Sequence, residues 1–185
     1  QNLTVTTGGA LTDSGAVTVA GLATIVATGQ SVTLGDSTTA NFGSLDFAGS
    51  AVTITEASSM AIAASEATGA LALVANGAMT QSGAIDGDST ASFTAGANAI
   101  TLANAGNDFG GAVSLSNSGT NDVSLRDTNA LDLGTVGVGQ NLTVTTGGAL
   151  TDSGAVTVAG LATIVATGQS VTLGDSTTAN FGSLD

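Results

Sequence analysis

The sequence predicts an all-β chain folded as a right-handed parallel β-helix, a three-faced β-solenoid with about 23 residues per turn and about eight turns. Two observations support this fold class. Residues 1–46 recur without a change at 140–185, so the chain contains a tandem repeat whose unit spans 1–139. Short apolar-x-apolar triplets, separated by Gly, Asn, Asp, Ser and Thr, punctuate the whole chain and are typical of strands with one buried face.

The repeat unit is itself doubled. Leu11–Val17 resembles Met79–Ile85, and Val52–Glu56 resembles Val123–Asp127. We therefore expect a single elongated solenoid segment, because stacked repeats bury a continuous core. Its expected parts are 1–185 as one segment, 1–139 as one full tandem repeat with half-repeat lengths of 68 and 71, and 140–185 as the start of the next identical repeat.

The triplets fall into three interleaved series, one for each expected face of the solenoid. The first contains Leu3/Val5, Ala23/Ile25, Leu45/Phe47, Leu71/Leu73, Ala91/Phe93, Val113/Leu115 and Leu142/Val144. The second contains Val32/Leu34, Val52/Ile54, Ile100/Leu102 and Val123/Leu125, with weaker members near Leu11 and Met79 whose register stays open. The third contains Val17/Val19, Ala40/Phe42, Met60/Ile62, Ile85, Asn107/Phe109, Leu131/Leu133 and Val156/Val158. Six turns per unit give the expected turn length, and Leu3, Ala23 and Leu45 should lie directly above one another.

Other folds explain these patterns less well. An antiparallel sandwich uses similar turns, but it gives no reason for three series to keep step through a whole unit. Disorder does not maintain alternation. The Ala-rich stretch 58–75 has helix propensity, yet Met60/Ile62 and Leu71/Leu73 fit strands, so we expect the stretch 63–70 between them to form a long corner loop. The small inward residues and five Phe predict a narrow core with Phe as the bulky filler.

Composition excludes several classes of function. The chain has one Lys or Arg and 14 Asp or Glu, for a net charge of −13, and it contains no His, Cys, Lys, Trp, Tyr or Pro. Most nucleophiles, general bases and soft metal ligands are therefore missing, and phosphate backbones are repelled. We expect no enzyme and no nucleic-acid partner, and assign no catalytic, cofactor-binding or metal-binding residue. The longest apolar run, 70–75, is too short to span a membrane.

Calcium is the one cation that the sequence leaves as an alternative to no cofactor. Asp36 and Glu56 each follow a second-series strand by two positions, so they could sit on adjacent turns. Asp86 and Asp88 cluster in a turn, and calcium prefers several carboxylate oxygens. Neither the EF-hand pattern nor the calcium-roll pattern is present.

Other surface features are weaker. An outward series of Thr4, Thr24, Asp46, Ala72, Ser92 and Ser114 is too irregular for an ice-binding array. Asn2 and Asn141 begin Asn-Leu-Thr glycosylation sequons, which arise easily in a Thr-rich chain. Arg126 and Asp127 are expected to form a weak surface ion pair. Because an initiator Met and a signal sequence are missing, we expect a piece of a longer protein.

The stretches GGALTDSGAVTVAGLA, NDFGGAVSL and DTNALDLGTVGVGQNLTVTTGGAL resemble the repeats of giant bacterial surface proteins of the filamentous-haemagglutinin type. The resemblance covers essentially the whole chain. It implies a secreted protein at the bacterial cell surface, β-helical along much of its length, that works as an adhesin stalk or extracellular fibre. Expected partners are further copies, end to end or between fibres, and a glycan or cell surface. The alternative function is a solenoid module that binds carbohydrate or a protein partner.

Overall fold

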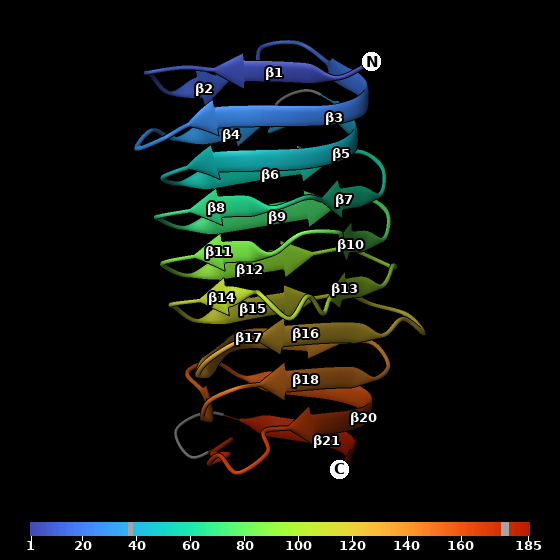
Figure 1. The fold of residues 1–185 in the computed structure, drawn as a ribbon. Coiled ribbons are helices and arrows are strands. Elements are labelled where there is room, and N and C mark those ends of the chain that lie inside the picture. The colour runs from blue at the N-terminus through green and yellow to red at the C-terminus, as the bar shows by residue number, and fades with distance from the viewer. Residues whose placement is uncertain (37–38, 175–177) are drawn as a thin grey trace.

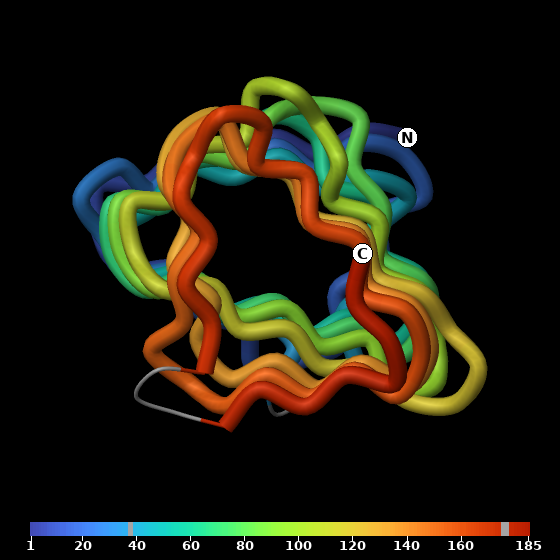
Figure 2. Tube along the Cα trace, turned by 90° about the horizontal axis from the view of Figure 1, so that it is seen from below, coloured from blue at the N-terminus to red at the C-terminus, as the bar shows by residue number. Residues whose placement is uncertain are grey.

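The computed structural model describes residues 1–36, 39–174 and 178–185, and within them every regular element is a β-strand. All strand pairings are parallel and join the strands into one continuous sheet that winds around a single interior (Figures 1 and 2). A parallel β-solenoid is thus confirmed. In the described parts no helix could cross a membrane. The strands are β1 (Leu3–Thr6), β2 (Leu11–Thr12), β3 (Val17–Ala27), β4 (Val32–Leu34), β5 (Ala40–Gly49), β6 (Val52–Glu56), β7 (Met60–Ile62), β8 (Ser65–Ala67), β9 (Leu71–Ala75), β10 (Met79–Gln81), β11 (Ile85–Gly87), β12 (Ala91–Thr94), β13 (Ile100–Leu102), β14 (Asp108–Phe109), β15 (Val113–Ser116), β16 (Val123–Asp127), β17 (Leu131–Val138), β18 (Leu142–Thr146), β19 (Leu150–Asp152), β20 (Val156–Val165) and β21 (Ala179–Leu184).

The middle turns contain three strands each, as a three-faced solenoid requires. The strands β6, β7 and β8 form one turn, β9, β10 and β11 the next, and β12, β13 and β14 the one after. Towards the two ends, two sides of a turn merge into one long strand, as in β3, β5 and β20 (Figure 1).

The turns are shorter and more numerous than predicted. Leu3 pairs with Ala23 and Ala23 with Leu45, as the sequence predicted. Leu45 then pairs with Ile62, which is a shorter step along the chain than either of those two. Successive turns are about 20 residues apart and number about nine, so about seven turns, not six, fit into one repeat unit.

The membership of the predicted series changes at β5. Both β7 and β8 pair with this long strand, and β8 occupies part of the stretch expected to be a corner loop. Leu71 therefore stacks on Val52 and not below Leu45. Ala91 and Val113 continue the column of Leu71, whereas Leu142 stacks on Val123 in a different column. Met60 likewise pairs with Met79, so the third series is also mixed.

Aligned segments of the two half-repeats lie on different faces. Val52 shares a face with Val32 and Leu71. Its sequence counterpart Val123 shares another face with Ile100 and Leu142. The half-repeats therefore span a non-integral number of turns.

The core is a narrow column of inward Ala, Val, Leu, Ile, Met and Phe side chains, as expected from the composition. Phe42, Phe47, Phe93 and Phe109 are buried in it. The rings of Phe93 and Phe109 meet edge to face, with centroids 5.8 Å apart and an interplanar angle of 72°. These aromatic fillers occupy the interior where aliphatic residues alone would leave space.

Candidate functional site

The polar residues form three arrangements. In the interior, side chains hydrogen-bond to backbone N–H groups at places where the pairing between strands is interrupted. On the surface, one row of carboxylates and one row of hydroxyls run from turn to turn, and each row is called a file below. In the described parts of the chain, no three His, Cys, Asp or Glu side chains gather so as to hold a metal ion. The open grooves on the outside are lined by short side chains of neighbouring turns.

Glu56 is a buried carboxylate at the end of β6. Only 1% of the residue is exposed. Its Oε1 accepts hydrogen bonds from the backbone N–H of Phe42 at 2.9 Å and from the Ser58 hydroxyl at 3.2 Å. Oε2 is buried without a hydrogen-bond partner. Burial raises the pKa of Glu56, and the hydrogen bonds from Phe42 and Ser58 only partly offset this rise.

Asp127 has the same role later in the chain, at the end of β16. Its Oδ2 accepts from the backbone N–H of Phe109 at 3.1 Å, and its Oδ1 from the N–H of Asn129 at 2.8 Å. Burial raises the pKa of Asp127, hydrogen bonds from Asn129 and Phe109 oppose the rise, and the charge of Asp108 adds to it. The sequence aligned Glu56 with Asp127, and the structure gives both the same task of capping the N–H of a buried Phe.

The structure does not bring Asp36 and Glu56, one of the two predicted pairs of calcium ligands, together. Leu34 pairs with Ile54, so Asp36 and Glu56 do lie on adjacent turns. Between strand and carboxylate, however, Gly35 adopts a φ of 72°, and Asp36 is exposed while Glu56 is buried. The two carboxylates therefore face different surroundings, and a shared ion would need them on one side of the sheet.

A buried amide cluster was missed by the sequence analysis. Gln81 Nε2 donates to Asn107 Oδ1 at 2.7 Å, and Asn107 Nδ2 donates back to Gln81 Oε1 at 3.0 Å. Asn107 Oδ1 also accepts from the N–H of Ile85, and its Nδ2 donates to the carbonyls of Leu102 and Arg126. One fully buried amide thus connects three successive turns. The predicted alternation placed Asn107 at an inward position, which was the available signal.

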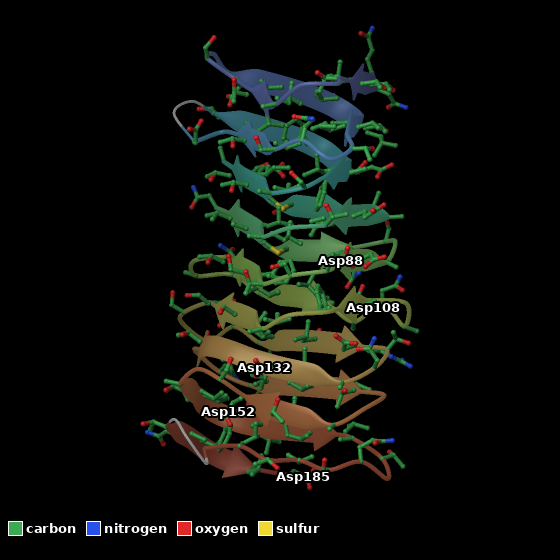
Figure 3. All side chains as sticks on the ribbon, turned by 90° about the vertical axis from the view of Figure 1, so that its left-hand side faces the viewer. Asp88, Asp108, Asp132, Asp152 and Asp185 are labelled. Carbon is green, nitrogen blue, oxygen red and sulfur yellow. The ribbon has the colours of Figure 1, made fainter. Side chains whose placement is uncertain are left out.

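Carboxylates line up on one face. Glu66 pairs with Asp86, and Asp86 with Asp108, on β8, β11 and β14; we call these three residues the acidic file. Burial raises the pKa of Asp86, and the charges of Asp88 and Asp108 raise it further. Asn129 Nδ2 donates to Asp108 Oδ1 at 2.8 Å from the next turn. In Figure 3 the labelled Asp108 of this file lies below Asp88.

Hydroxyl groups line up on another face. The hydroxyl file consists of Thr80, Thr101, Ser124, Thr143 and Thr163, which are register partners on five successive turns. Four of them line an open groove together with Asp122, Asn141 and the exposed Leu161. The outward series predicted from the sequence was wrong. Thr4, Thr24 and Asp46 form one file, and Ala72, Ser92 and Ser114 belong to another.

The two asparagines of the predicted glycosylation sequons accept backbone hydrogen bonds, whereas the predicted Arg126–Asp127 ion pair is not formed. The Oδ1 atoms of Asn2 and Asn141 accept from the N–H groups of Leu22 and Leu161 on the following turn, at 3.0 and 2.9 Å. The expected ion pair of Arg126 with Asp127 is absent from the described contacts. Arg126 is exposed and Asp127 buried, because successive residues of a strand point to opposite faces.

Comparison with known proteins places the chain among repeat proteins. Residues 1–46, 49–116 and 120–184 match the family described as repeats of unknown function (DUF5649). The chain belongs to this family. No curated protein and no solved structure matches the chain. Membership of a repeat family agrees with the stacked turns of the solenoid. The description of the family names no ligand.

Proposed function

We propose that the chain is a non-catalytic structural segment of a secreted, tandem-repeat bacterial surface fibre or adhesin stalk. The observation that carries this proposal is the continuous parallel pairing from β1 to β21 in a chain whose opening stretch, 1–46, recurs at its end. A stack of this kind extends by repetition without a new fold. The secreted and cell-surface parts of the proposal rest on the resemblance to repeats of the filamentous-haemagglutinin type.

Such a segment determines how far the fibre extends from the cell surface. Each turn adds a rise of about 4.8 Å, the spacing between hydrogen-bonded strands. About seven turns per period then lengthen the rod by about 34 Å for each additional unit. Reach therefore scales with the number of repeats.

The charge of the surface supports a role as a separate rod. The net charge is −13, and the acidic file places like charges on adjacent turns. Like-charged rods repel each other, and surface charge discourages lateral growth of sheets. The faces therefore favour fibres that stay apart.

The test is a change of repeat number in the parent gene. An epitope tag placed beyond the repeats is located by immunogold electron microscopy on intact bacteria, with one repeat unit, equivalent to 1–139, deleted or added. We expect labelling of intact cells and a shift of the tag by about 34 Å per unit. A tag that labels only lysed cells, or whose distance ignores the repeat number, contradicts the proposal. A scrambled segment of equal length and composition controls for chain length alone.

A second candidate is a carbohydrate- or partner-binding module, and the hydroxyl file is the observation that favours it. Regularly spaced hydroxyls beside Asp122, Asn141 and the exposed Leu161 offer hydrogen bonds and an apolar contact to an extended ligand. A glycan array tests this function. Hits abolished by Thr143→Val but retained by Thr53→Val, an exposed Thr on another face, support it. Hits equally sensitive to both variants, or no hits, argue against it.

A further inference from the structure

The strands follow one another around three faces in a fixed order, and the part of a turn that lies on one face is called a side here. The first face carries β1, β8, β11, β14 and β19. The second face carries β2, β4, β6, β9, β12 and β15. The third face carries β7, β10, β13, β16 and β18. The long strands β3, β5, β17 and β20 each cover two consecutive faces.

The repeated stretch of sequence changes face from one copy to the next. Leu3 lies on the first face, whereas its copy Leu142 lies on the third, where it pairs with Val123. Leu11 lies on the second face, and its copy Leu150 lies on the first. Both copies are therefore displaced by one face, and in the same sense.

The third face follows the same rule. Val17 lies on it, and its copy Val156 lies on the second face, where it pairs with Val136. A whole number of turns would return every residue to its own face, so the repeat unit is one side short of a whole number of turns. The half-repeats agree, because Val52 lies on the second face and its counterpart Val123 on the third. Two advances of one side around three faces equal one step back.

Charge is distributed unequally over the three faces of one unit. The acidic file lies on the first face, where Asp46 lines an open groove together with Glu66 and Asp86 of the file. Among the described residues, the strands of the second face hold no outward charge. Their outward register partners are Thr33, Thr53, Ala72, Ser92 and Ser114. If each unit spanned whole turns, the second face would run uncharged along the whole fibre.

We propose that a tandem array of this chain displaces its surface pattern by one face with each repeat unit, so that the acidic file comes round to all three faces in turn. No face then offers a second copy an uncharged strip along the length of the fibre. This inference rests on the proposed function and deepens it, because it names the feature that keeps neighbouring fibres apart.

The physical consequence concerns rods that lie side by side. Each face carries an acidic file once in every three units, or about every 100 Å along the axis. Two parallel rods therefore either oppose two acidic files or bury one file against an uncharged face. The first arrangement costs like-charge repulsion, and the second removes carboxylates from water. Uncharged sheet faces without such interruptions are the ones that stack into extended assemblies.

Cysteine cross-linking of the full chain tests the change of face. The chain contains no Cys, so two introduced thiols are the only ones present. Ser124→Cys with Thr143→Cys places thiols on register partners of neighbouring strands, at a separation that a disulfide can span. We expect an intramolecular disulfide under mild oxidation, identified by mass spectrometry. The control is Asp132→Cys with Thr143→Cys, because Asp132 lies on the first face, where whole turns would place Thr143. A bond in the control, or none in the first pair, overturns the proposal.

A three-unit array, made by repeating 1–139, tests the consequence for fibres. Glu66→Gln with Asp86→Asn in every unit removes two charges from the acidic file. Asp36→Asn with Asp122→Asn removes the same number of charges from exposed positions outside it. At low salt, small-angle scattering and electron microscopy should show a larger cross-section for the first variant only, while the control and the unchanged array stay single rods. Circular dichroism verifies that both variants remain folded.

Two results of the array experiment overturn the proposal. Equal thickening of both variants would mean that net charge, and not its position, keeps the rods apart. Single rods in all three samples would mean that the acidic file does not prevent lateral contact. The tag assay on intact cells measures reach and does not depend on lateral separation, so failure here leaves the stalk function to its own test.

Discussion

The backbone N–H of Phe42 donates to Oε1 of Glu56 across 2.9 Å, from one turn to the next. The pairing between their strands is broken at this point. Ala40 pairs with Glu56, but the next ladder contact joins Leu45 to Ile62, because the later chain turns a corner while β5 runs straight. The carboxylate takes the place of the missing backbone carbonyl. It satisfies a buried donor at the expense of burying a charge.

Glu56→Gln should reduce the pH dependence of stability. Burial raises the pKa of Glu56 above its ordinary value of 4.5, so the folded state binds this proton more tightly than the unfolded state. The contribution of this group to stability is then fully present below 4.5 and is lost as pH rises through the raised folded pKa. Urea unfolding followed by far-UV circular dichroism between pH 5 and 8 should show a shallower fall in the variant.

Glu66→Gln is the control for this prediction, because it removes one carboxylate of the same type from an exposed position. It should retain more of the pH dependence than Glu56→Gln. Equal slopes in the two variants would show that overall charge, and not the buried carboxylate, sets the response.

The two half-repeats place polar side chains at equivalent positions, where each side chain accepts a hydrogen bond from a backbone N–H of a neighbouring turn. Asp127 caps Phe109 as Glu56 caps Phe42, and the sequence aligned these two acids. Asp13 accepts from the N–H of Gly35 and the aligned Gln81 from the N–H of Asn104.

The type of fold, the inward residues and the stacking of Leu3 on Ala23 could be predicted, because alternation and repetition depend on local sequence.

The length of a turn could not be obtained in the same way. Matching half-repeats suggested whole turns between aligned residues, yet Val52 and Val123 lie on different faces. The local pattern of Val-x-Ile or Val-x-Leu is the same on every face, so it carries no information about which face a strand joins. The surface files depend on this register, and for that reason the acidic and hydroxyl files were missed.

Asn107→Ala should destabilise the chain more than a surface Asn→Ala change. The substitution leaves the N–H of Ile85 and the carbonyl of Leu102 without their buried partner, at a cost of about 1–3 kcal/mol for an unpaired buried group. Asn76→Ala is the control, since Asn76 is exposed. Urea unfolding gives both free energies. Similar values for the two variants would contradict a supporting role for the amide cluster.

Phe42 and Phe181 offer the same substitution in identical sequence but in different surroundings. Phe42 is buried, whereas Phe181, its copy in the last turn, is half-buried. Phe42→Ala should cost about 3–5 kcal/mol through loss of contacts and the cavity that remains. Phe181→Ala should cost clearly less in dilute solution. Equal losses of stability, measured by urea unfolding, would mean that the last turn is covered as fully as the interior.

Asp86→Asn should stabilise the chain at low salt. Asp86 is the central member of the acidic file, between Glu66 and Asp108, and like charges directly opposite on neighbouring strands cost about 0.2–1 kcal/mol. The gain in melting temperature should shrink as sodium chloride is raised, since salt shortens the range of repulsion. Asp36→Asn removes an exposed acid outside the file and should raise the melting temperature less.

Because the predicted effect arises only from screening of charge repulsion, calcium chloride at equal ionic strength should act like sodium chloride. A saturable calcium effect at low concentration, lost in Asp86→Asn, would instead mean that the file binds the ion directly.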